Sequence, residues 1–218
     1  MSDIIQVLEY NKMEILVLLI VITTLGLLIV SLLKKVFSKY RKEYIEQYIF
    51  SNSLIQKLKQ QYPQLNTKEI KSVFEGLRSY FQICNIVGDK EVATVSVVVA
   101  SALSEFIRDY KEYKLFCAKS LGYTLIQNSL SNEYNLEYKK IKRAWFASCE
   151  LEKLNSSKTK RLPFLFSLDE RLKIKNGNVY PIEQMQKLKH IGFLEDNIRE
   201  EYKGEKLTFS NHADTGYR

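Results

Sequence analysis

The longest apolar segment of the chain begins at Ile15 and ends at Leu33, and no charged residue interrupts it. An α-helix needs about 20 such residues to cross the roughly 30 Å hydrocarbon core of a bilayer. The segment is apolar on every side, so it lacks the polar face that a surface helix of a soluble protein turns to water. The pattern therefore predicts a transmembrane helix over residues 15–33, preceded by a short extracytoplasmic N-terminus over residues 1–14.

The residues before this segment argue against a cleavable signal peptide. A signal peptide begins with basic residues and ends at a small-residue cleavage site. Here Asp3, Glu9 and Glu14 outnumber Lys12, and the apolar segment ends in Leu-Leu-Lys-Lys. We therefore expect the segment to remain in the mature protein as an anchor.

Basic residues follow the apolar segment much more densely than they precede it. Lysine and arginine are retained on the cytoplasmic side, so we expect a single-pass protein of the cell inner membrane with its C-terminal domain in the cytoplasm. Anionic headgroups attract these cations, and aromatic rings favour the headgroup layer. The expected membrane-interface residues are Lys34, Lys35, Phe37, Lys39, Tyr40, Arg41, Lys42 and Tyr44.

Beyond the anchor, hydrophobic residues recur at helical spacing and predict an all-α fold. A basic, Tyr-rich juxtamembrane helix is expected over residues 34–62; it can break at residues 51–53 and ends before Pro63. A compact helical cytoplasmic domain is expected over residues 63–189, and a tail over residues 190–218. The helices predicted within the domain cover residues 67–87, 92–121, 131–154, 164–174 and 181–189. Residues 95–99 could instead form a short strand, and Asn176-Gly177 could close a minor hairpin.

Composition supports a single folded domain behind the anchor. The 218 residues include eight Gly and three Pro against 14 Tyr and 11 Phe, which disfavours a loop-rich or disordered chain. The formal charge is +8, and the excess lies in residues 34–60 and 139–161. Lipid headgroups account for the first cluster. In the second, Lys139, Lys142 and Arg143 could form a basic binding surface, but Trp145 falls on the apolar stripe and favours a core helix with solvated lysines.

The residues that could carry chemistry are few. Cys84, Cys117 and Cys149 each lie near aromatic residues, and an odd number in a reducing compartment indicates free, buried thiols. His190 and His212, the two histidines, both lie in the predicted tail. The chain has no glycine-rich phosphate loop, no zinc-ligand spacing and no nucleophile elbow. We therefore expect no catalytic residue, no bound metal and no cofactor.

Three tracts between about residues 70 and 182 share spaced residues with a known family. The matching positions are Glu105, Phe106, Ile107, Tyr113, Phe116, Cys117 and Gly122, then Arg143, Trp145, Cys149 and Glu152, and finally Arg161, Leu162, Pro163, Leu165, Phe166, Leu168 and Asp169. They resemble the motifs D-x-x-W-H-x-F-I-x-x-T-x-x-Y-x-x-F-C, R-x-x-W-x-x-x-C-x-x-E and R-L-P-x-L-F-x-L-D of a family of uncharacterised bacterial proteins. The first motif is also distantly similar to plant glycine-rich-domain proteins.

The chain departs from that family at the motif histidines. The Trp-His pair of the family becomes Leu103-Ser104, and a later His-His pair becomes Ile126-Gln127. Leucine, serine and isoleucine cannot replace imidazole as a metal ligand or proton shuttle. The resemblance thus implies a shared fold and structural roles for Phe106, Tyr113, Phe116, Cys117, Gly122, Trp145, Cys149, Arg161, Pro163 and Asp169. Arg161 and Asp169 are the charged members of this set, and an Arg–carboxylate pair between them could lock the loop to the helix that follows it.

Together these features predict a membrane-anchored, non-enzymatic interaction or scaffold module. The expected partners are membrane lipids with anionic headgroups and either a protein or a second copy of the chain. A membrane-tethered enzyme or metal-dependent protein is one alternative. Nucleic-acid binding through residues 139–161 is another, and we do not expect it.

Overall fold

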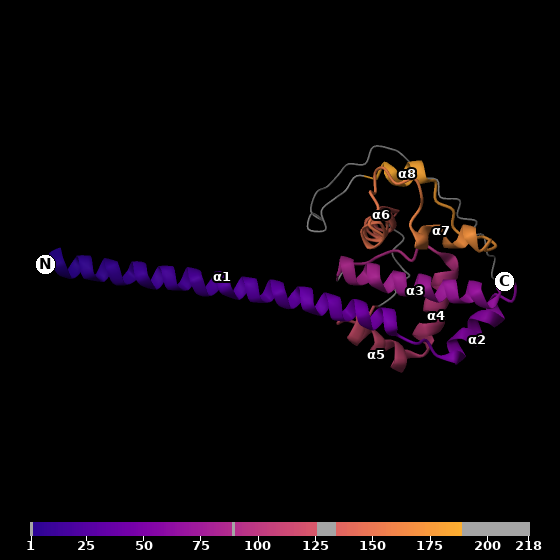
Figure 1. The fold of residues 1–218 in the computed structure, drawn as a ribbon, viewed down its shortest axis with the longest axis horizontal. Helices are drawn as coiled ribbons and strands as arrows, with labels where there is room; N and C mark the ends of the chain where they lie inside the picture. The colour runs from indigo at the N-terminus through magenta and orange to yellow at the C-terminus, as the bar shows by residue number, and fades with distance from the viewer. Residues whose placement is uncertain (1, 89, 126–133, 189–218) are drawn as a thin grey trace. The chain divides into compact units, whose positions relative to one another are not determined.

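The computed structural model describes residues 2–88, 90–125 and 134–188, with side chains from residue 16 onward except at 34 and 134–136. In those ranges the chain is helical and contains no strand, which confirms the all-α prediction (Figure 1). The minor hairpin that Asn176-Gly177 could have closed does not form, because the backbone there makes turns, with the Gly177 N–H donating to the carbonyl of Ile174 at 2.9 Å. The chain divides into two compact units, Met1–Arg41 and Lys42–Arg218.

Helix α1 (Ser2–Gln47) is continuous and includes the whole apolar segment. From Leu16 it is long and apolar enough to cross a membrane, with a mean hydropathy of 3.0 and no buried residue in its most apolar window. The hydroxyls of Thr23 and Thr24 donate to carbonyls one turn earlier at 2.9 Å. These hydroxyls therefore find acceptors within the helix, as a lipid environment requires.

The predicted juxtamembrane helix over residues 34–62 is two helices. The first is the end of α1, where Ile45 is fully buried in the second unit. Helix α2 (Asn52–Gln61) begins after Ser51, whose side chain accepts a hydrogen bond from the Leu54 N–H at 3.3 Å. The break covers residues 48–51, so it begins three residues before the Ser-Asn-Ser sequence and ends at its first serine, which satisfies a free N–H group of the new helix.

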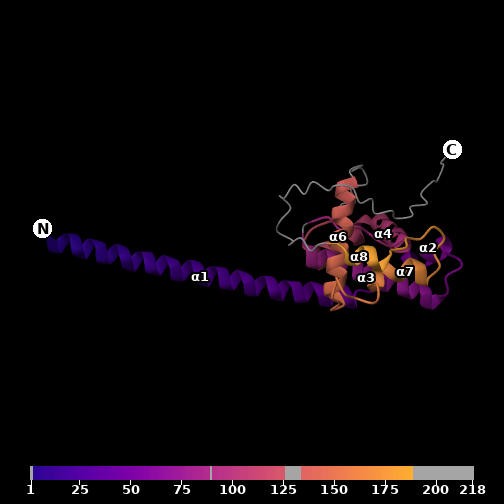
Figure 2. The same ribbon diagram turned by 90° about the horizontal axis from the view of Figure 1, so that it is seen from above.

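Helix α3 (Thr67–Val87) confirms the clearest helical prediction and runs through the centre of the domain (Figure 2). Asn66 and Glu69 form a reciprocal capping box at its start. Near its middle, Gly76 lets two neighbouring helices approach closely. A Cβ atom there would lie 2.7 Å from Leu168 Cδ2 and 2.8 Å from Val99 Cγ2.

The single helix predicted over residues 92–121 is wrong in its start and in its continuity. Residues 91–96 form neither helix nor strand, and α4 (Val97–Arg108) begins only after Ser96. The chain then turns at Asp109, whose carboxylate caps α5 (Tyr110–Ser120) by accepting the Glu112 N–H. The end of α5 is as expected, because Gly122 has a φ of +84° and donates its N–H to the Cys117 carbonyl.

The last three helices match the predicted ones but are shorter. They are α6 (Tyr134–Leu151), α7 (Phe164–Arg171) and α8 (Ile182–Gln186). The loop expected over residues 155–163 separates α6 from α7. The predicted start of α6 at residue 131, the end of the last helix at residue 189 and the tail over residues 190–218 lie outside the described residues.

Candidate functional site

An apolar pocket of about 260 Å³ lies between α2, α3 and the segment that joins α1 to α2. Its walls include the buried side chains of Phe50, Ile70 and Phe74. Ile49 stands at its edge with 86% of its surface exposed, more than any other large apolar side chain described. A pocket below the usual 300–1,000 Å³ of small-molecule sites suits one or two apolar side chains of a partner.

The turn before α2 is held so that Ile49 faces outward. On one side of it, Tyr48 packs edge-on against Phe116 with ring centroids 4.5 Å apart. On the other side, Phe50 packs on Phe74 at 5.0 Å. Because Tyr48 and Phe50 on either side pack against the core, Ile49 between them is left in solvent.

Arg78 of α3 ties the same turn in place. Its Nη2 donates to the Tyr48 carbonyl at 2.6 Å, and its guanidinium lies 5.1 Å from the centre of the Phe50 ring. Its Nη1 also pairs with Glu75 at 3.0 Å. Arg78 thus fastens the turn that presents Ile49 to α3 at two points, and Glu75 holds the guanidinium in place, so the pocket is preformed.

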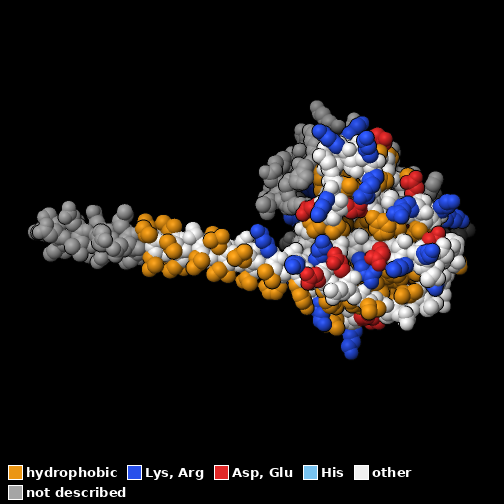
Figure 3. Space-filling view, viewed as in Figure 1, with side chains coloured by type: hydrophobic (Ala, Val, Ile, Leu, Met, Phe, Trp, Pro, Cys, Tyr) orange, Lys and Arg blue, Asp and Glu red, His pale blue; other side chains and the backbone are white. Residues whose placement is uncertain are grey.

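The rim of the pocket is more basic than acidic. Lys59, Lys71 and Arg78 line it together with one carboxylate, that of Glu75. The lining contains no histidine and no cysteine. The arrangement is therefore suited to binding an apolar side chain that has an acidic group beside it. Figure 3 shows that apolar side chains of the domain itself lie among charged ones on one of its faces.

Sequence reasoning missed this pocket because it allowed a break only at residues 51–53 and kept Ile49 within the preceding helix. In a continuous helix, Ile49 would have joined the buried stripe. The available signal was the Ile-Phe pair next to Ser-Asn-Ser, which marks the point where the chain leaves helical geometry.

The aromatic residues of the first family tract lie together in the core. Phe106 packs edge-on against Tyr113 at 5.4 Å and against Phe116 at 5.4 Å. Tyr113 also donates its hydroxyl to the Leu125 carbonyl at 2.9 Å, and Cys117 is buried beside it. These positions pack the domain; none of them lines the pocket.

The second and third tracts meet in a separate part of the core. Trp145 is fully buried and packs edge-on against Phe166 at 5.4 Å, as expected of a residue on the apolar stripe. Cys149 and Pro163 are also buried. Pro163 occupies the position directly before the first residue of α7.

The carboxylate of Asp169, in the third tract, accepts four hydrogen bonds, and the residue is only 2% exposed. It accepts the Ser96 hydroxyl at 2.6 Å and the Val97 N–H at 2.7 Å, both at the start of α4. It also accepts the Val98 N–H at 3.3 Å and the Asn178 N–H at 3.0 Å. The carboxylate thus caps a helix that lies about 70 positions earlier in the sequence, at the end where the helix dipole favours negative charge.

The pair of Arg161 and Asp169 that the sequence suggested does not form. Arg161 Nη1 instead lies 2.6 Å from Glu152, and 61% of the arginine side chain is exposed. The second oxygen of Glu152 accepts the Phe164 N–H at the start of α7. Glu152 therefore joins the loop to the start of α7, while the Asp169 carboxylate accepts hydrogen bonds from the start of α4.

All three cysteines are buried free thiols, as predicted. Desolvation by burial raises the pKa of Cys84 and of Cys149 to about 12, and it also raises the pKa of Cys117. A thiolate is the reactive form, so these groups are unreactive at neutral pH. Desolvation likewise raises the pKa of Tyr113 and Tyr180.

The three residues of the expected basic surface have different environments. Lys139 is exposed, but Lys142 is only 5% exposed, and its ammonium lies 5.8 Å from the centre of the Tyr138 ring. Arg143 donates to the Glu91 carbonyl at 3.0 Å, which fastens α6 to the segment before α4. The expectation of a shared solvent-facing surface is therefore wrong for Lys142.

The expected membrane-interface residues divide between the two units. Lys34, Lys35, Phe37, Lys39, Tyr40 and Arg41 belong to the first unit, and the side chains of Phe37 and Tyr40 are exposed. Lys42 is exposed in the second unit and lies 3.8 Å from Glu46. Tyr44 is half-buried and packs on Phe116 at 5.9 Å, so it belongs to the packing of the domain.

The fold and the pocket define a helical domain that follows a long apolar helix. Within the described residues, no cluster of His, Cys, Asp or Glu is suited to hold a metal ion. Comparison with protein families matches residues 40–202 to the UCP032817-like family. The match covers most of the chain, so the protein belongs to the UCP032817-like family, which is uncharacterised. Curated proteins and solved structures give no match.

Proposed function

We propose that this protein is a membrane-anchored, non-enzymatic interaction module that recruits a protein partner through the pocket between α2 and α3. The observation that carries the proposal is a preformed apolar pocket with a basic rim, beside an isoleucine that is 86% exposed. Water contact with such a side chain is unfavourable, and exposed apolar groups rimmed by polar ones mark interaction sites. The partner would insert an apolar side chain next to an acidic residue.

The anchoring part of the proposal rests on the composition of α1. The helix is long and apolar enough to cross a bilayer, and basic residues follow its apolar segment. We propose a single span in the inner membrane of a bacterium, with the N-terminus outside and the domain in the cytoplasm. Tethering would raise the effective concentration of the domain for other membrane proteins.

The family relationship fits a binding role. We propose that this chain is a divergent member in which Leu103 and Ser104 stand where related chains carry a Trp-His pair. The motif residues that it keeps are engaged in packing and capping, as Phe106 and Asp169 illustrate. A role that depends on a surface needs the fold but not the histidines.

Site-specific photocrosslinking in intact membranes tests the pocket. A photoreactive amino acid in place of Ile49 should give a discrete crosslinked product. The Thr67→Trp variant fills the pocket from its exposed edge and should abolish that product, and Lys71→Glu should weaken it. A photoreactive group in place of Val179, which is also exposed but outside the pocket, provides the matched control. The proposal fails if positions 49 and 179 give the same products, or if Thr67→Trp leaves the product unchanged.

A further inference from the structure

The exposed side chains of α5 all lie on one half of the helix. At about 100° per residue, the six of them span one continuous half-turn of the helix surface. They are Tyr110, Lys111, Lys114, Leu115, Ala118 and Lys119. Tyr110 is 61% exposed and Leu115 is 57% exposed, so the apolar members of this face are uncovered as well as the lysines.

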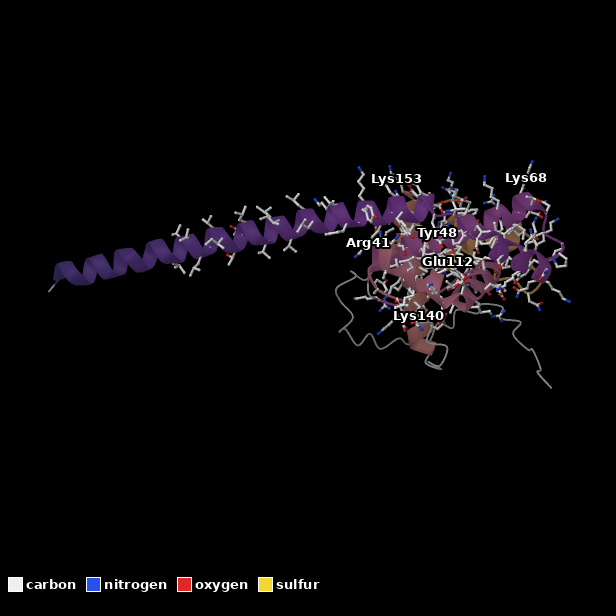
Figure 4. All side chains as sticks on the ribbon, turned by 90° about the horizontal axis from the view of Figure 1, so that it is seen from below. Arg41, Tyr48, Lys68, Glu112, Lys140 and Lys153 are labelled. Carbon is white, nitrogen blue, oxygen red and sulfur yellow. The ribbon has the colours of Figure 1, made fainter. Side chains whose placement is uncertain are left out.

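The other half of α5 fixes the helix in this orientation. Tyr113, Phe116 and Cys117 are buried in the core, so α5 cannot rotate about its axis without unpacking the domain. The acidic residue of the helix, Glu112, lies at the boundary between the halves and accepts the Tyr48 hydroxyl at 2.5 Å (Figure 4). The exposed half therefore carries three lysines and no carboxylate.

The acidic groups at the start of α5 do not neutralise this face. Asp109 caps the helix by accepting the Glu112 N–H at 3.4 Å. Glu105, one turn earlier in α4, forms an ion pair with Arg108. The lysines of α5 thus keep a net positive charge on the exposed half.

Tyr44, which contacts this face of α5, follows the predicted membrane span closely along the chain. Lys119 Nζ lies 5.8 Å from the centre of the Tyr44 ring, and Tyr44 packs on Phe116 of α5. Tyr44 follows Leu33 by 11 residues, a length of chain that reaches at most roughly 40 Å. Any bilayer that holds residues 15–33 is therefore within reach of α5.

We propose that the exposed half of α5 is a second membrane contact, which binds the anionic headgroups of the bilayer that holds α1. Lysine stems lie along apolar surface while their ammonium groups reach the phosphates, and Tyr110 and Leu115 enter the boundary of the headgroup layer. Each lysine near an anionic bilayer strengthens the attraction by about fivefold, so three give on the order of 100-fold. This contact would fix which face of the domain is turned toward partners. It rests on the proposed anchoring of α1.

Fluorescence of a reporter tryptophan in the full chain tests this contact. The native Trp145 is fully buried, so it supplies a constant background. Leu115→Trp protein is reconstituted into phosphatidylcholine vesicles with and without phosphatidylglycerol, and brominated lipid serves as the quencher. We expect quenching and a blue shift that appear with the anionic lipid and decline at high salt. Val179→Trp is the matched control, for which neither change is expected.

Charge variants complete the experiment. A triple variant with glutamate at all three lysines (Lys111→Glu, Lys114→Glu and Lys119→Glu) should abolish the quenching. A triple variant with glutamine at the same three positions should reduce the quenching and leave the fold intact. Vesicle flotation in the same samples separates the two proposals. Protein that does not float overturns the anchoring and this contact with it. Protein that floats but shows no lipid-dependent quenching of Leu115→Trp, or quenching that the charge variants leave unchanged, overturns the α5 contact alone.

Discussion

The Asp169 carboxylate accepts the Ser96 hydroxyl at 2.6 Å, joining the end of α7 to the start of α4. Three backbone N–H groups donate to the same carboxylate. Helix α4 packs against α3, and Asn178 also donates its side-chain amide to the Val95 carbonyl at 3.1 Å. One buried side chain thus joins Ser96, the first turn of α4 and the turn after α7.

The first prediction concerns this carboxylate. Asp169→Asn replaces one acceptor oxygen by an NH₂ group, which cannot accept from the hydroxyl or the N–H groups that converge there. We expect a loss of about 2 kcal/mol in unfolding free energy, the cost of buried donors left without acceptors. Denaturant unfolding of the full chain in detergent, followed by circular dichroism, measures this loss.

Asp109→Asn provides the matched control. Asp109 also caps a helix, but it is exposed, and asparagine caps helices as well as aspartate does. We expect its effect to stay within about 0.5 kcal/mol. Equal effects of the two substitutions would contradict the special role of Asp169.

The sequence was sufficient to predict α3 because its apolar stripe, its capping residues and its C-terminal glycine all agree. It was insufficient at residues 92–121, where the hydrophobic spacing continues through Asp109 although the helix does not. The position of a cap such as Asp109 depends on where the packing of the domain interrupts the helix and leaves backbone N–H groups without acceptors. The partner of Asp169 was equally hidden, because a contact between residues 96 and 169 leaves no trace in local periodicity.

A second prediction separates the two possible partners of Arg161. The arginine lies 2.6 Å from Glu152, but its side chain is mostly exposed. A double-mutant cycle between Arg161→Ala and Glu152→Ala should give a coupling of about 0.5 kcal/mol, typical of an exposed ion pair. The same cycle with Asp169→Ala should give a coupling near zero. A larger coupling with Asp169 would restore the pair that the sequence suggested.

A third prediction concerns the close approach at Gly76. Its substitution by alanine places a methyl group within 3 Å of Leu168 and Val99 side-chain atoms, both in the buried core. Overpacking of this kind costs about 1–3 kcal/mol. Gly26→Ala in α1 is the control, since a Cβ there meets nothing within 4 Å. Thermal unfolding should show a lower Tm for Gly76→Ala alone, and an unchanged Tm would exclude the tight packing of α3.

The fourth prediction uses the thiols. The raised pKa values of Cys84 and Cys149 leave almost no thiolate at pH 8, so iodoacetamide should label neither in the folded protein and both after denaturation. Mass spectrometry of the alkylated chain measures this. Rapid labelling of either thiol in the folded state would contradict its burial.

The same thiols give a pH dependence of stability. Unfolded thiols ionise near pH ~8.5, below the folded pKa of about 12, so the unfolded state releases protons first. The stabilising contribution is complete below pH ~8.5 and declines as the pH rises toward 12. Unfolding free energy measured against pH should fall in this range, and Cys84→Ala should make the fall shallower. An identical slope in the variant would show that Cys84 does not contribute.

The central claim is that the apolar segment of α1 anchors the domain in a bilayer. Alkaline carbonate extraction of membranes from cells that express the full chain tests it most directly, with the intact mass of the recovered protein measured in the same sample. We predict that the protein stays in the membrane pellet and retains residues 15–33. Protein released into the supernatant, or a mature chain that has lost this segment, would contradict the account.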